Sequence, residues 1–218
     1  NLIIMSTRRT MASTLETRTN QKALLYIHSN NTNEFLELVR TRSIDPNYRD
    51  ENAIPLLHHA IIEKNVDIVE GLLELEADVD AISPCIENEY EYGVSTMTLI
   101  AWMYMKNESD ALDNNVSDVS DRDRLDEILR LCLSRKPLLL TIEEDGENTR
   151  LFGFLYANMP DVRIKAAAKH LSDMLIKYCP IESLNIRPGN IIELAGYPKF
   201  TIHMITQKGL DLTFNGTF

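Results

Sequence analysis

The side chains best suited to chemistry are the adjacent pair His58-His59 and three cysteines, Cys85, Cys132 and Cys179. Neighbouring side chains on a helix point about 100° apart, so the two histidines are poorly placed to share one ion. The cysteines lack the short spacing of a metal-binding motif, and their odd number is typical of a reduced compartment rather than a secreted disulfide framework. We therefore expect no metal and no cofactor, and a cytoplasmic location.

A nucleophilic thiol paired with a histidine is the sharpest enzymatic alternative. Cys132 falls on the apolar stripe of an expected helix, which favours a core position, and Cys179 ends another helix just before Pro180. Only Cys85 is expected to be exposed. The 8 glycines form no phosphate-binding loop and no dinucleotide fingerprint. We therefore expect no catalytic residues.

Composition narrows the partners that the chain can bind. Hydrophobic residues make up 44% and charged residues 25% of the 218 positions, as in ordinary soluble proteins. A net charge of −11 disfavours nucleic acids and anionic membranes, and no basic face offsets it. The short basic run at 6–19 lies in a segment, 1–19, that we expect to be a disordered tail. No apolar run approaches the roughly 18 residues that cross a bilayer.

The most informative stretch for the fold is 47–81, NYRDENAIPLLHHAIIEKNVDIVEGLLELEADVDA. An apolar segment begins at Pro55 and ends at a polar break at 63–65. A second apolar stripe follows at Ile68, Val69, Leu72 and Leu73, with the spacing of one helix face. The pattern predicts two short helices joined by a tight turn.

This two-helix pattern recurs along the chain. A first unit lies 33 residues earlier and has Ile27 in the place of Ala60. A third opens at 96–101 and resumes at 125–133, a fourth covers 145–178, and a fifth covers 191–212. One helix pair cannot bury its apolar face alone, so such units must stack.

The stretch 47–81 resembles the ankyrin repeat, both in its opening, Pro55 to Ala60, where Pro55 and Leu56 replace the usual Thr and Pro, and in its exit, Glu76 to Asp80. It departs from that repeat at Ala53, Lys64 and Glu76, where glycine is common, which weakens the turns. The resemblance implies an all-α ankyrin-repeat solenoid of about five helix pairs with short β-hairpin-like fingers over 20–218. It also implies that His58 is a structural residue whose ring hydrogen-bonds neighbouring backbone groups.

Two insertions interrupt the repeat. The finger at 81–92 is eight residues longer than the period needs (41 against 33, counted from Ala60 to Ala101). The Asp-, Asn- and Ser-rich stretch 107–123 is expected to be a solvated insert loop between the two helices of the third pair. The second helix of the fourth pair, near 163–178, is expected to extend beyond its neighbours.

By the resemblance, a partner binds at the finger tips and the inner-helix face. Tyrosine and tryptophan would serve as anchors, and the carboxylates would select a basic partner. The alternative is that the acidic finger at 87–92 is only solvated surface, and that Trp102 packs between repeats. The partner-binding positions expected on this basis are Asp50, Glu51, Asn52, His59, Glu63, Glu87, Glu89, Tyr90, Glu91, Tyr92, Trp102 and Tyr104.

The resemblance therefore implies a monomeric protein–protein interaction module, an adaptor or an inhibitor. The irregular, Asn- and Ile-rich repeats also resemble ankyrin proteins of intracellular bacteria and large DNA viruses. That likeness implies an effector that acts on a host protein in the host cytoplasm. Two alternatives stay open: a Cys/His hydrolase on an ankyrin-like scaffold, and the recognition part of a larger chain.

Overall fold

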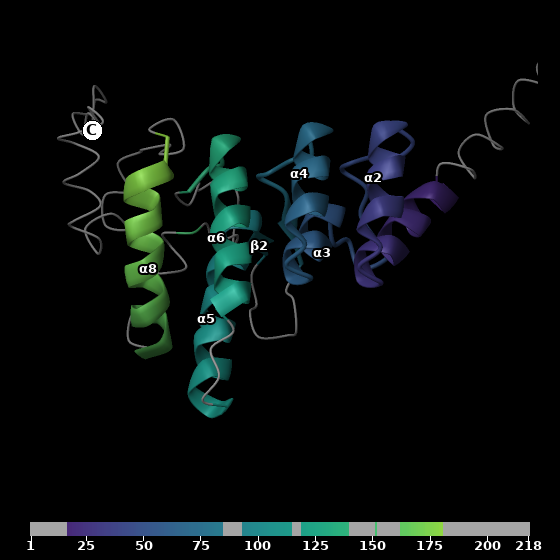
Figure 1. The fold of residues 1–218 in the computed structure, drawn as a ribbon. Helices are drawn as coiled ribbons and strands as arrows, with labels where there is room; N and C mark the ends of the chain where they lie inside the picture. The colour runs from purple at the N-terminus through teal and green to yellow at the C-terminus, as the bar shows by residue number, and fades with distance from the viewer. Residues whose placement is uncertain (1–16, 85–92, 115–118, 140–150, 152–161, 181–218) are drawn as a thin grey trace, which may run out of the picture. The chain divides into compact units, whose positions relative to one another are not determined.

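The computed structural model describes residues 17–84, 93–114, 119–139, 151 and 162–180. It is mostly helical, with one small two-stranded hairpin, which confirms the expected helical class (Figure 1). The chain divides into two compact units, Asn1–Asp78 (unit 1) and Val79–Phe218 (unit 2).

Unit 1 opens with a helix that includes residues 17–28, here called the first helix. Residues 17–19 are therefore helical, and the expectation of a disordered tail that reaches 19 is wrong at its end. The physical reason is that Asn20 is buried, and its Oδ1 accepts a hydrogen bond from the Asp45 backbone N–H at 3.0 Å. This bond ties the helix to the chain that follows the next helix, α2 (Thr32–Arg40).

The second helix pair of unit 1 consists of α3 (Leu56–Ile62) and α4 (Val66–Glu74). Asn65 caps α4, because its side-chain oxygen accepts from the Ile68 N–H at 3.1 Å. The apolar stripe predicted for this helix is buried, and Leu72 is fully inaccessible. Helices α2 and α4 pack closely: a Cβ on Gly71 would lie 3.1 Å from Leu36 Cδ2.

The two pairs repeat the same backbone geometry. The second residue after the first helix and the second residue after α3, Asn30 and Lys64, have φ of 54° and 51°. Those that follow α2 and α4, Arg42 and Glu76, have φ of 50° and 65°. Both pairs of positions are 34 residues apart (64 − 30 and 76 − 42). The period is thus one residue longer than the expected 33, and it places Ile27 opposite Ile61 rather than Ala60.

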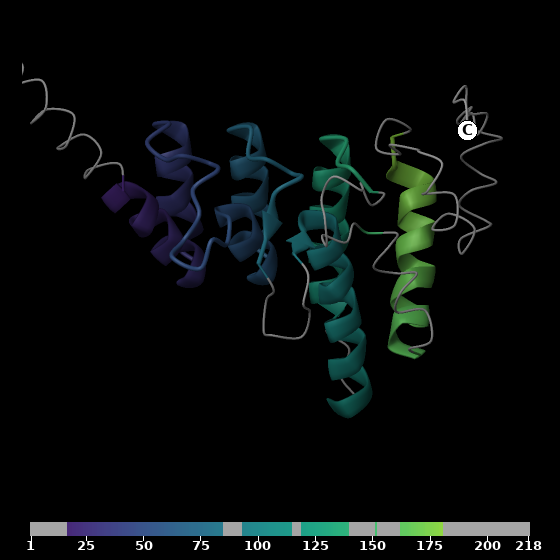
Figure 2. The same ribbon diagram turned by 180° about the vertical axis from the view of Figure 1, so that it is seen from behind.

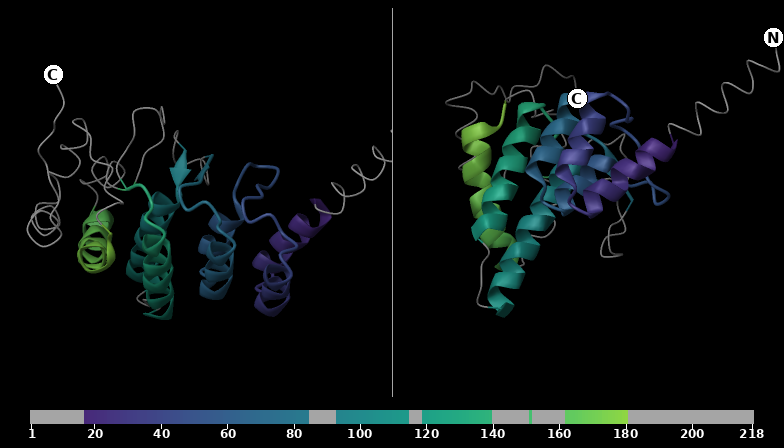
Figure 3. Two further views of the ribbon diagram at one scale, coloured as in Figure 1. Left: turned by 90° about the horizontal axis from the view of Figure 1, so that it is seen from above. Right: turned by 45° about the vertical axis from the view of Figure 1, so that its right-hand side comes forward.

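A turn at residues 45–55, here called the finger turn, joins the two pairs of unit 1. It projects to one side of the helices when they are viewed nearly end-on (Figure 3, left). Its fold depends on Asp50, whose Oδ1 accepts from the backbone N–H groups of Asn52 at 2.9 Å and Ile54 at 2.8 Å. An isolated antiparallel bridge between Arg49 and Pro55 closes it.

Unit 2 begins with a hairpin in which β1 (Ile82–Ser83) pairs antiparallel with β2 (Val94–Ser95), with Ile82 opposite Ser95. This agrees with the hairpin-like finger expected here, although the finger tip at 85–92 lies outside the described residues. Three long helices follow: α5 (Thr96–Asn114), α6 (Val119–Ser134) and α8 (Val162–Tyr178). Helix α5 packs against both of the others (Figures 1 and 2).

Helix α8 confirms the helix predicted near 163–178. Its 17 residues do not exceed the 19 of α5, so the expectation that it outreaches its neighbours is wrong. The first helix of the fourth predicted pair lies almost wholly outside the described residues, and the fifth pair at 191–212 lies entirely outside them.

The expected insert loop at 107–123 is mostly helix. Helix α5 continues to Asn114, and α6 starts at Val119. Asp, Asn and Ser cost only a few tenths of a kcal/mol each in a helix relative to average residues, so an established helix can extend through them. Asp121 lies in the first turn of α6, where a carboxylate is favourable, and it pairs with Arg124 at 3.8 Å.

One hydrogen bond recurs at the exits of helices in both units. Asn47 Oδ1 accepts from the Asp78 N–H at 2.7 Å, two residues after the left-handed Glu76. In unit 2, Asp80 Oδ1 accepts from the Leu138 N–H at 2.7 Å, two residues after Lys136, whose φ is 56°. The end of α6 thus has the same exit chemistry as the end of α4.

Candidate functional site

The tip of the finger turn contains three of the expected contact residues. Glu51 and Asn52 are exposed, as the expectation requires. Asp50 is not available to a partner, because its side chain is only 9% exposed and both of its oxygens are engaged. Its role is to build the turn that presents the other two.

His59 was expected to contact a partner, and the structure contradicts this. The residue is 7% exposed and its Nε2 lies 3.1 Å from Asp50 Oδ2. Burial lowers the pKa of His59, and the nearby His28 lowers it further, while the charge of Asp50 opposes the shift. His59 therefore acts from beneath the surface, as a support for the finger turn. Its neighbour His58 is fully buried, in keeping with a structural residue.

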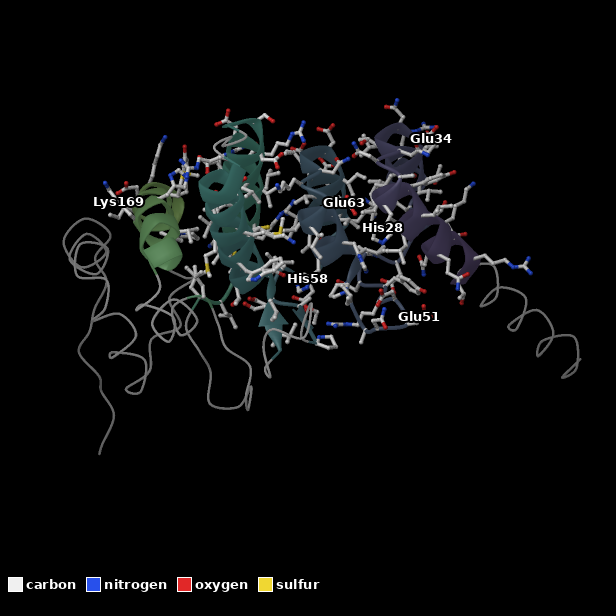
Figure 4. The ribbon with its side chains drawn as sticks, turned by 90° about the horizontal axis from the view of Figure 1, so that it is seen from below. His28, Glu34, Glu51, His58, Glu63 and Lys169 are labelled. Atoms are coloured by element: carbon white, nitrogen blue, oxygen red, sulfur yellow. The ribbon has the colours of Figure 1, made fainter. Side chains whose placement is uncertain are left out.

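Glu63 is exposed as expected and has a partner that the sequence analysis missed, His28 of the first helix. His28 Nδ1 lies 3.1 Å from Glu63 Oε1, and the His28 ring meets the His59 ring edge to face at 4.9 Å. Figure 4 shows His28 and Glu63 side by side, with Glu51 farther along toward the finger turn. The sequence contained a clue to this contact. His28 is the last residue of the first helix and lies 35 residues before Glu63, close to the 34-residue period of the repeat.

These residues define a surface that we call the unit 1 face: His28, Glu51, Asn52 and Glu63. Each is exposed, and each rests on buried or hydrogen-bonded structure beneath it. Glu34 lies on the opposite side of the unit from Glu51 (Figure 4). The arrangement offers exposed carboxylate, amide and imidazole groups on an ordered backbone, which suits recognition of a polar or basic surface.

In unit 2 the two expected aromatic contacts behave differently from each other. Trp102 is half-buried, and the Lys106 Nζ lies 5.0 Å from the centre of its ring, a cation–π arrangement. Tyr104 is 1% exposed, so the expectation that it contacts a partner is wrong. Its hydroxyl donates to Asp126 Oδ1 at 2.6 Å instead.

Asp126 also meets a histidine from a third helix. His170 Nε2 lies 2.7 Å from the same Oδ1, and the Tyr104 and His170 rings are 5.4 Å apart. Burial and the Asp126 carboxylate raise the pKa of Tyr104 above its ordinary value. This polar junction joins α5, α6 and α8. Residues so far apart in the chain gave no sequence signal of their contact.

Comparison of the chain with protein-family models, curated proteins and solved structures finds no match. Functional inference therefore depends on the geometry of the described residues. The remaining expected contacts, Glu87, Glu89, Tyr90, Glu91 and Tyr92, lie outside those residues, as does Cys85.

The described cysteines lack the properties of a nucleophile. Cys132 and Cys179 are both fully buried, and burial raises the pKa of the Cys132 thiol to about 12. A nucleophilic thiol requires the opposite shift. Within the described part of the chain, no group of three or more histidine, cysteine or carboxylate side chains could hold a metal ion. Across the same residues, no helix is both long and apolar enough to span a bilayer.

Proposed function

We propose that the chain is an ankyrin-type repeat protein that binds a partner protein through the unit 1 face. The observation that carries the proposal is the recurrence of one helix–turn–helix geometry after 34 residues, with left-handed residues at Asn30 and Lys64 and again at Arg42 and Glu76. Repeats of this length, built from two short helices and a projecting turn, are typical of ankyrin proteins.

Further support comes from the exit of α6, where Lys136 and the Asp80–Leu138 hydrogen bond reproduce the chemistry found after α4. In unit 1 the helix pairs bury their apolar stripes, while Glu51 and Asn52 at the tip of the finger turn and Glu63 at the end of α3 are exposed. Repeat proteins use surfaces of this kind for binding, because the stack holds them rigid at little entropic cost.

The chemistry of the face favours a basic partner. Glu51 and Glu63 carry charge at its surface, and the whole chain has a net charge of −11. Such charges steer association and select against acidic partners more than they add affinity, and their reach is about 8 Å at physiological salt.

The test compares two charge-matched double variants in quantitative affinity purification, followed by binding measurements on the partner recovered. Glu51→Lys with Glu63→Lys alters the unit 1 face. Glu34→Lys with Glu70→Lys makes the same change of net charge at exposed positions of α2 and α4. Both variants should retain helical circular dichroism.

We expect the face variant to lose at least about tenfold in affinity, because two reversed charges repel a basic partner and a repulsion of about 1.4 kcal/mol has that effect. The control should bind within about twofold of wild type. An equal loss of affinity in both variants would mean that binding responds only to net charge. Full binding by the face variant would mean that the binding site does not lie on the unit 1 face.

A further inference from the structure

We propose that His28, His59 and Asp50 form an acid-sensitive link that holds the finger turn closed at neutral pH and releases it on acidification. The inference depends on the proposed function only where it assigns the turn to partner binding. The link itself consists of contacts within unit 1 and can be tested without a partner.

The link begins at Asp50, whose two oxygens have separate tasks. Oδ1 accepts from the N–H groups of Asn52 and Ile54 and so shapes the turn. Oδ2 accepts from His59 Nε2 at 3.1 Å, because an ionised carboxylate is an acceptor only. The same bond requires a proton on His59 Nε2. One buried imidazole thus positions the carboxylate on which the turn depends.

The environment of His59 disfavours a second proton on its ring. Among the described residues, the charged and titratable groups that act on it are Asp50 from the finger turn, His28 from the first helix and Glu63 at the end of α3. The two carboxylates favour the imidazolium form. Burial and a charge on His28 disfavour it and prevail.

Acid therefore favours an arrangement in which the His59 ring reaches water and can be protonated. That movement breaks the contact between His59 Nε2 and Asp50 Oδ2, which leaves the carboxylate bonded only through Oδ1. The N–H groups of Asn52 and Ile54 then donate to a carboxylate that His59 no longer holds in place. The tip of the turn at Glu51 therefore loses its defined geometry.

His28 couples this event to the surface. Its side chain is 47% exposed and is bonded to Glu63, while its ring touches that of His59 at 4.9 Å. A positive charge on His28 disfavours a positive charge on the His59 ring, and so lowers the pKa of His59. Removal of His28 should therefore let His59 take up its proton at higher pH.

The experiment is an NMR titration of the full chain between about pH 8 and about pH 5, the range in which histidine changes charge. Backbone amides of Asn52 and Ile54 and the imidazole of His59 are followed together, and amide exchange is expressed as protection factors. We expect the two amides to shift with the His59 midpoint and to lose at least about tenfold in protection, as an opening worth about 1.4 kcal/mol requires.

Three variants sharpen the result. His59→Gln retains a side-chain donor but cannot titrate, so the two amides should stop responding to acid. His28→Ala should raise the His59 midpoint, and it keeps the test usable if His59→Gln does not fold. His170→Gln, in the polar junction of unit 2, is the matched control and should leave Asn52 and Ile54 unchanged.

Amides of Asn52 and Ile54 that keep full protection at about pH 5 would overturn the proposal. So would an unaltered acid response in His59→Gln, or an unaltered His59 midpoint in His28→Ala. If the response occurs as expected but a partner dissociates no faster in acid, the link stands and its assignment to binding fails. If the face variant binds normally at neutral pH, the proposed function fails, but the result of the NMR titration is unaffected.

Discussion

Replacing Glu76 by glycine should make the protein more stable, although the change shortens an exposed side chain to nothing. Glu76 follows α4 with φ of 65°, a conformation in which the Cβ of an L-residue crowds the backbone. Its N–H still donates to the Leu73 carbonyl at 3.1 Å, a bond that glycine would keep. The substitution therefore removes strain and leaves the helix exit in place.

The size of the effect follows from two opposing contributions. The left-handed conformation costs about 1–2 kcal/mol for a residue with a Cβ, and glycine avoids this cost. Glycine also gains about 0.5–1 kcal/mol of conformational entropy in the unfolded chain, which offsets part of the benefit. We expect a net stabilisation of about 0.5–1 kcal/mol. Arg42, with φ of 50° at the same repeat position, should respond alike, and the two changes should add.

Urea unfolding of wild type, Glu76→Gly, Glu76→Ala and the double variant with Arg42→Gly gives the measurement. Glu76→Ala retains a Cβ and should change little. Glu74→Gly, at the helical end of α4, should destabilise by about 0.5–1 kcal/mol and shows that glycine is not favourable in itself. If Glu76→Gly proves as destabilising as Glu74→Gly, the left-handed strain at the repeat exits does not exist in solution.

Three other outcomes follow from burial and charge. Leu72→Ala should cost about 2–5 kcal/mol of unfolding free energy in a denaturant titration, whereas Leu25→Ala, 63% exposed in the first helix, should cost almost nothing. Folding lowers the pKa of His59 from its ordinary value of about 6.5, so below that pH the unfolded chain binds more protons than the folded chain. The free energy of unfolding should therefore decrease as the pH is lowered from about 6.5 toward the pKa of the folded state. A series of melting curves across that range should flatten in His59→Gln, and an unchanged slope would contradict the sign. Tyr104→Phe removes one of the two donors to Asp126 among the described residues and should cost about 1–3 kcal/mol, measured by thermal unfolding; an unchanged midpoint would contradict the role given to this bond.

Helix positions could be predicted from the sequence because burial imposes a period on apolar residues. Ile68, Val69 and Leu72 lie on one face of α4 and are fully buried, as their spacing indicated. The sites of backbone strain were also readable. Ala53, Lys64 and Glu76 depart from glycine in the ankyrin pattern, and all three have positive φ.

The register between repeats could not be fixed by the same reasoning. Ala60 and Ile61 are both apolar and both fully buried, so either could match Ile27. Only the backbone geometry of the turns decides between 33 and 34 residues. Composition misled in a related way at 107–123, where an Asp-, Asn- and Ser-rich stretch typical of a loop forms the end of α5 and the start of α6.

Two of the side chains expected at the binding surface, His59 and Tyr104, are buried instead, and the physical reason is the same for both. Sequence position indicates which residues can reach the finger side of a repeat, but not whether a hydrogen-bond acceptor lies nearby beneath the surface. His59 and Tyr104 each find a buried or half-buried carboxylate within 3.1 Å, Asp50 and Asp126 respectively. Both carboxylates receive donors from separate parts of the chain, and each accepts a histidine as well.

These two carboxylates explain how packed helices can hold neighbouring segments of the chain in defined positions. An apolar stripe is non-directional and tolerates sliding of one helix on another, whereas a carboxylate bonded to several donors fixes their positions. Asp50 accepts from the turn and from α3, and Asp126 accepts from α5 and α8. Specificity of position thus comes from polar groups that lie beneath the surface. Substitution of Asp50 should therefore disorder Glu51 and Asn52 as a pair, and it would impair binding without removing any contact atom.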